Sequence, residues 1–109
     1  MLKKLLLVIF FVVPVMAQAN SSFSSSKVTK IILHDWGRAL IYLEGTVNTN
    51  EDCTNKGYIA LHKDNQHFSE MYSAALAAYH SGSEIAGWVN GCDSKHNAPT
   101  LSRLDLLPK

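Results

Sequence analysis

The chain lacks the closely spaced residues that usually identify an enzyme or a metalloprotein. It has two cysteines and five histidines, but no C-x-x-C pair, no H-E-x-x-H and no second half of a zinc motif. A thiol redox centre and a zinc site both need such spacing, and no serine has a base and an orienting group in a recognisable arrangement. We therefore expect no enzymatic activity, no metal and no cofactor. The histidines weighed as catalytic or metal-ligating residues are His34, His62, His67, His80 and His96.

A strong excess of charge is also missing. The formal net charge of the whole chain is +1, and without Lys3 and Lys4 eight basic side chains remain against nine acidic ones. Nucleic acids and anionic lipids attract proteins that carry a clear basic patch or excess. We therefore expect no nucleic-acid partner.

No apolar run is long enough to cross a bilayer as a helix. The run Leu5–Val15 falls well short of the roughly 20 residues that a membrane span needs. Lys3 and Lys4 before it and Ala17-Gln18-Ala19 after it complete the three parts of a secretory signal peptide, residues 1–19. Cleavage near Ala19 would leave a periplasmic or secreted protein without stable membrane insertion.

The two cysteines then lie in an oxidising compartment, where a disulfide between Cys53 and Cys92 is the favoured prediction. It would close a loop of about 40 residues, for which the chain-entropy estimate of stabilisation is up to about 4 kcal/mol. Two free buried thiols are one alternative. A metal site seeded by Cys92 and His96 is another, but the further ligands are absent.

The exported part is predicted to be a single domain, residues 27–109, preceded by a flexible, serine-rich lead-in at 20–26. Residues 66–81 carry apolar side chains at steps of three and four, which predicts an amphipathic helix that Gly82 ends. Apolar and polar residues alternate as in β-strands at 27–34, 38–45, 57–62, 84–90 and 100–107.

This order of elements predicts a mainly β protein with one α-helix. The favoured fold is a five-stranded, partly open barrel of the oligonucleotide/oligosaccharide-binding (OB) type, in the order β-β-β-α-β-β, with the helix closing one end and one disulfide. An open antiparallel sheet with a packed helix is the alternative.

One stretch of the chain resembles a known pattern. The run Phe68–Cys92, FSEMYSAALAAYHSGSEIAGWVNGC, has a helix that ends in Ser-Gly and a strand that ends in Gly-Cys, and it resembles small secreted bacterial OB-fold-like proteins. The order of elements is also similar to that of the B subunit of subtilase cytotoxin, a pentameric glycan-binding barrel. The resemblance implies a homo-oligomer that recognises a glycan. No residue role is carried over, because no glycan-contacting motif is matched.

Asp35, Trp36 and Arg38 form the cluster that the sequence offers for ligand binding. A tryptophan beside charged groups can stack on a sugar ring or anchor a partner protein. The sequence favours a plainer interpretation, in which the tryptophan covers a barrel end and the Asp-Arg pair spans a turn. The first functional hypothesis is a non-catalytic binding module for a glycan or a partner protein. The alternatives are a structural or stress-associated envelope protein acting through protein contacts and, last, a small hydrolase or metalloprotein.

Overall fold

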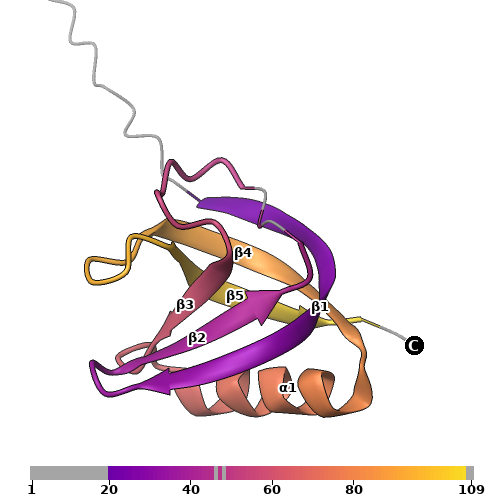
Figure 1. Cartoon of the computed structure of the whole chain (residues 1–109). Coiled ribbons are helices and arrows are strands. Elements are labelled where there is room, and N and C mark those ends of the chain that lie inside the picture. The colour runs from indigo at the N-terminus through magenta and orange to yellow at the C-terminus, as the bar shows by residue number, and fades with distance from the viewer. Residues whose placement is uncertain (1–19, 46, 48, 108–109) are drawn as a thin grey trace, which may run out of the picture.

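The computed structural model of the 109-residue chain describes residues 20–45, 47 and 49–107. The predicted signal peptide at 1–19 lies outside the described residues. Within the described part there are five strands and one helix (Figure 1). They are β1 (Asn20–His34), β2 (Arg38–Leu43), β3 (Tyr58–His62), α1 (Phe68–Ser81), β4 (Glu84–Cys92) and β5 (Pro99–Leu106). None of the described helical residues form a helix long and apolar enough to span a membrane.

The strands hydrogen-bond in a ring, in the order β1-β2-β3-β5-β4, and β4 pairs back to β1. Neighbouring strands are antiparallel except β3 and β5, whose parallel register is the single pair Ala60 and Thr100. The prediction of a mainly β chain with five strands and one helix is confirmed. The alternative of an open sheet is wrong, because each of the five strands pairs with a neighbour on both sides and no edge strand remains among them.

The expectation of a flexible lead-in at 20–26 is also wrong, because these residues form the first half of β1. Phe23 is buried in the core, and its register partner in β4 is Gly87. Ser21 is buried and donates a hydrogen bond to Oε2 of Glu51 at 3.0 Å. A run of serines carries no hydrophobic alternation, so its strand conformation follows from pairing with β4 rather than from its own sequence.

Gly87 marks a close approach between β4 and β5. A Cβ at this position would overlap the backbone carbonyl of Arg103 in β5. We expect Gly87→Ala to lower the free energy of unfolding by about 1 to 3 kcal/mol, because the β5 backbone must move to make room. Urea denaturation measures the change, with Gly57→Ala as the matched control, since a Cβ at Gly57 meets nothing within 4 Å. Equal stability of the two variants would contradict the close approach.

α1 lies across one end of the ring (Figure 1). The predicted apolar stripe is correct only in part, because Leu76 and Tyr79 are 40% and 49% exposed. Small alanine side chains meet the barrel in their place, which allows the helix axis to come close to the sheet. The helix begins at Phe68, two residues later than predicted, and Gly82 ends it with φ 75°, as predicted. The residues of α1 that pack on the core are Phe68, Met71, Tyr72, Ala75 and Ala78.

Candidate functional site

Five aromatic side chains gather on the outside of the ring, over β1, β2 and β3. The ring centroids of Tyr42 and Tyr58 are 4.8 Å apart, and Tyr58 lies 6.2 Å from His96. His96 is 5.5 Å from Trp36 and 5.0 Å from His34, which is itself 4.5 Å from Trp36. We call these five residues the aromatic platform.

Strand alternation places two of the five rings. Tyr42 and Tyr58 are register partners on β2 and β3. They face outward because their neighbours Ile41 and Ile59 fill the core on the other face of the sheet. Trp36 lies in the turn between β1 and β2, where its side chain is 51% exposed. The platform therefore extends from a turn along the middle of two strands.

His96 belongs to the β4–β5 loop, residues 93–98, which folds over the outer face of β2 and β3. Leu40 and Ala60 are register partners on that face, and both are buried, as is Ala98 of the loop. These three side chains lie outside the main core cluster. The loop therefore has an apolar contact of its own with the strands that carry the tyrosines.

Asp93 holds the β4–β5 loop from within. Its carboxylate is fully buried: Oδ1 accepts a hydrogen bond from Nε of Arg38 at 2.7 Å and contacts Nε2 of His62. Oδ2 accepts the backbone N–H groups of Lys95 and His96 at 2.9 and 2.8 Å. Burial alone would raise the pKa of Asp93, but the hydrogen bonds from Arg38, the two amides and His62 outweigh burial and lower the pKa to about 2. The carboxylate is therefore charged and fully paired at neutral pH.

The pKa of the Tyr58 phenol shifts in the opposite direction to that of Asp93 and is raised. Burial raises its pKa, and the negative charges of ionised Tyr42 and of Asp93 add to the rise. Tyr58 therefore keeps its proton at neutral pH and can act as a hydrogen-bond donor on the platform.

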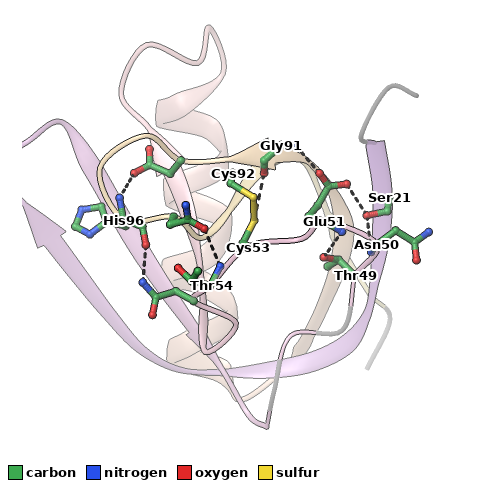
Figure 2. Close-up of a disulfide and its surroundings, with 12 residues drawn as sticks. Ser21, Thr49, Asn50, Glu51, Cys53, Thr54, Gly91, Cys92 and His96 are labelled. Atoms are coloured by element: carbon green, nitrogen blue, oxygen red, sulfur yellow. Dashed lines mark hydrogen bonds between the residues drawn. A yellow bond between two sulfur atoms is a disulfide. The ribbon is translucent and has the colours of Figure 1, made fainter. Parts of the chain in front are cut away.

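The loop between β2 and β3 also contacts the β4–β5 loop, through the residues around Asn97. Asn97 accepts the backbone N–H of Thr54 on Oδ1 at 2.7 Å and the N–H of Asn55 on its carbonyl at 2.9 Å. The predicted disulfide between Cys53 and Cys92 is confirmed (Figure 2). Cys53 precedes Thr54 in the β2–β3 loop, and Cys92 is the last residue of β4, directly before the β4–β5 loop. Covalent and hydrogen-bonded links together fix the backbone that carries His96.

Glu51 secures the β2–β3 loop where it passes between β1 and β4. Its carboxylate accepts the hydroxyl of Ser21 at 3.0 Å on one oxygen and the N–H of Gly91 at 2.8 Å on the other (Figure 2). Glu51 is itself buried. Glu51 therefore ties the β2–β3 loop to both β1 and β4.

Two nitrogens of the platform lack a hydrogen-bond partner, Nδ1 of His34 and Nε2 of His96. Nδ1 of His34 lies 3.0 Å from a carboxylate oxygen of Asp35, but the two atoms do not form a hydrogen bond. An unsatisfied buried polar atom costs about 1 to 3 kcal/mol and is uncommon in folded proteins. The rings of both histidines lie beside the exposed ring of Trp36.

The structure separates the three residues that the sequence grouped as a binding cluster. Trp36 lies on the platform. The Asp35 side chain is 88% exposed beside His34, whereas the Arg38 side chain is 11% exposed and is paired with Asp93. The structural interpretation of an Asp35–Arg38 pair is therefore wrong. Arg38 positions the loop, and its other nitrogens donate to the Trp36 carbonyl at 2.7 Å and, at 3.3 Å, to the Ser94 hydroxyl.

The sequence patterns did not assign the other four residues of the platform. Alternation in the strands could have placed Tyr42 and Tyr58 on the face opposite Ile41 and Ile59, but their contact depends on the register of two strands. His96 reaches them only because the chain returns over the sheet. Among the described residues, no group of three His, Cys, Asp or Glu side chains could hold a metal ion. The residues left unassigned are His34, Tyr42, Tyr58 and His96.

No family model matches the chain in a comparison with models of known protein families, and a comparison with curated proteins finds no match either. The resemblance to small secreted bacterial proteins therefore remains an expectation.

Proposed function

We propose that this protein is a non-catalytic, secreted or periplasmic module that binds saccharides on the aromatic platform. One observation carries the proposal: Nε2 of His96, a buried ring nitrogen without a hydrogen-bond partner, lies within a cluster of five rings. Aromatic rings stack on the C–H faces of sugars, and convergent polar groups fix their hydroxyls. Neither a purely apolar ligand nor a small ion would use both kinds of group.

The position of the platform supports an OB-fold assignment and a ligand site on the same surface. OB barrels bind oligosaccharides and oligonucleotides on the face of strands 2 and 3 and on the loops between strands 1 and 2 and between strands 4 and 5. Here Trp36 comes from the first of these loops, Tyr42 and Tyr58 from the strands, and His96 from the second loop. The low net charge favours a saccharide over a nucleic acid.

The anchoring of the β4–β5 loop supports binding rather than packing alone. Asp93, Asn97 and the disulfide fix the loop backbone before any ligand arrives. A site that is already ordered loses less conformational entropy when it binds. We therefore expect a saccharide to bind without a large rearrangement of the loop.

The compartment is part of the proposal. The disulfide fits an oxidising environment, and the predicted signal peptide supplies a route to one. Saccharides of cell envelopes and matrices are accessible ligands there.

Trp36→Ala is expected to weaken saccharide binding at least about tenfold, because it removes the most exposed stacking surface of the platform. A glycan array probed with the purified, oxidised protein identifies a ligand, and calorimetric titration with that ligand measures the loss. Stability should change by less than about 0.5 kcal/mol, since the side chain is half exposed.

Tyr79→Ala is the matched control, because Tyr79 is an aromatic residue of similar exposure, 49%, on α1. It should bind the ligand as the unmodified protein does. An array without any saccharide signal, or equal losses in the two variants, would contradict the proposal.

A further inference from the structure

The rings of the platform form a row rather than a single patch. Among the described rings, Trp36 connects to Tyr42 through His96 and then Tyr58, with steps of 5.5, 6.2 and 4.8 Å between centroids. Each step is comparable to the length of one pyranose unit. Trp36 lies in the turn before β2 and Tyr42 lies near the far end of β2, so the row follows the length of that strand. A ligand that touches both ends must therefore contain several sugar units.

A lysine lies at each end of this row. Nζ of Lys30 is 4.3 Å above the ring centroid of Tyr42, and Nζ of Lys95 is 5.7 Å from that of Trp36. Both lysines are exposed. An ammonium group on an aromatic face keeps its charge and remains available to an anion.

The negative charges near the row do not cancel the two lysines. Asp93 is buried and paired with Arg38 and His62, so its charge is compensated inside the protein. Asp35 is 88% exposed and lies beside His34, near only the Trp36 end of the row. The ends of the row are therefore suited to anionic groups separated by neutral, ring-shaped units.

From these observations we infer that the platform binds the interior of a linear acidic polysaccharide, one whose units carry carboxylates. This inference rests on the saccharide-binding function proposed above and names its ligand class. A terminal sugar would occupy only one end of the row, whereas a chain passing over exposed Trp36 can continue beyond it. Carboxylates leave the ring hydroxyls free for the unpaired Nε2 of His96, whereas sulfate esters would replace hydroxyls.

A single-stranded nucleic acid also combines rings with anions, but it carries one phosphate per nucleotide. Binding one along its backbone requires a groove of cations that follows every phosphate. Among the described residues, a lysine lies over the ring at each end of the row, and neither Tyr58 nor His96 between them has a lysine over its ring. The charge spacing therefore favours the polysaccharide.

The test uses (1→4)-linked uronate oligomers of one to six units, titrated calorimetrically into the oxidised protein. Affinity should rise steeply up to about four units and then level off, because further units extend beyond the row. A neutral oligosaccharide of six units should bind more weakly than the uronate hexamer, and the difference should shrink at high salt. A monomer that binds as tightly as the tetramer would overturn the inference.

Lys30→Ala and Lys95→Ala should each weaken uronate binding by about two- to fivefold and should affect the binding of a neutral oligosaccharide less. Lys27→Ala is the matched control, because Lys27 is an exposed lysine of β1 whose register partner is Glu84 in β4, away from the platform. Equal effects of all three changes would overturn the inference.

Two further outcomes separate this inference from the proposed function. If neutral oligomers bind as tightly as uronates and Trp36→Ala abolishes both, the saccharide function stands and the acidic ligand class is wrong. If a single-stranded oligothymidylate binds more tightly than every saccharide, both proposals are wrong.

Discussion

Replacing Asp93 with alanine is expected to lower the free energy of unfolding by about 3 to 5 kcal/mol. The change removes a buried carboxylate, leaves the charge of Arg38 without its partner and takes away the contact with Nε2 of His62. Breaking a buried ion pair from one side typically has a cost of this size, because the remaining charge stays desolvated. The N–H groups of Lys95 and His96 lose their acceptor as well. For a domain of this size, the melting temperature should fall by more than about 10 °C.

Asp35→Ala provides the matched control for this measurement. It also removes a carboxylate next to a histidine, but the side chain is 88% exposed. We expect a change within about 0.5 kcal/mol, as for other exposed positions. Similar losses in the two variants would contradict the anchoring role of Asp93. Urea denaturation followed by circular dichroism compares the two.

Asp93 also predicts how stability depends on pH. Its pKa is about 2 in the folded protein, below the ordinary value of 3.8, so the folded state binds this proton less readily than the unfolded state does. The stabilisation is therefore fully present above about pH 5 and is lost as the pH falls through 4 toward 2. This pH-dependent stabilisation amounts to about 2 kcal/mol. Asp93→Asn should lack this part of the acid dependence, and unfolding curves at pH 7, 4, 3 and 2 measure it. Parallel curves for the two proteins would contradict the assignment.

Removing the disulfide is the second change with a large expected effect. Cys53→Ala combined with Cys92→Ala should lower the free energy of unfolding by up to about 4 kcal/mol, because the bond closes a loop of 39 residues in the unfolded chain. The bond also joins the β2–β3 loop to the β4–β5 loop (Figure 2). Without the bond, the amides of the β4–β5 loop should exchange hydrogen faster. The affinity for saccharide should fall, because the loop that carries His96 is less ordered.

Chemical reduction offers an independent check of the same link. A dithiol reductant should destabilise the unmodified protein to the level of the double variant and leave the double variant unchanged. Hydrogen exchange at Lys95 and His96 reports on the loop separately from the global unfolding measured in urea. Global destabilisation with unchanged protection at these two amides would show that Asp93, rather than the disulfide, holds the loop.

The strands and the helix were largely predictable, because each has a local period. Alternation around Ile41 and Ile59 marks β2 and β3, and steps of three and four mark α1. The first half of β1 was not predictable, since Ser21 to Ser26 alternate only weakly and their strand is set by pairing with β4. Likewise, the exposure of Tyr79 depends on the rotation of α1 against the barrel end.

The candidate site was predictable only at one residue. Trp36 stood out because a tryptophan in a turn between two strands is unusual. Arg38 was misassigned, because a charged residue near Asp35 suggested a local pair. Its true partner, Asp93, is 55 residues away in the sequence, and no local pattern indicates that contact.

Local sequence was sufficient to predict the helix, the strands other than the first half of β1, and the two cysteines available to bond, because these properties depend on neighbouring residues and on residue type. Only the tertiary structure decided that Tyr58 of β3 would meet His96 of the β4–β5 loop and that Arg38 would bind Asp93. The physical reason is ring closure: the pairing of β3 with β5 and of β4 with β1 brings segments that are distant in sequence onto one outer face. The aromatic platform exists only on that assembled face.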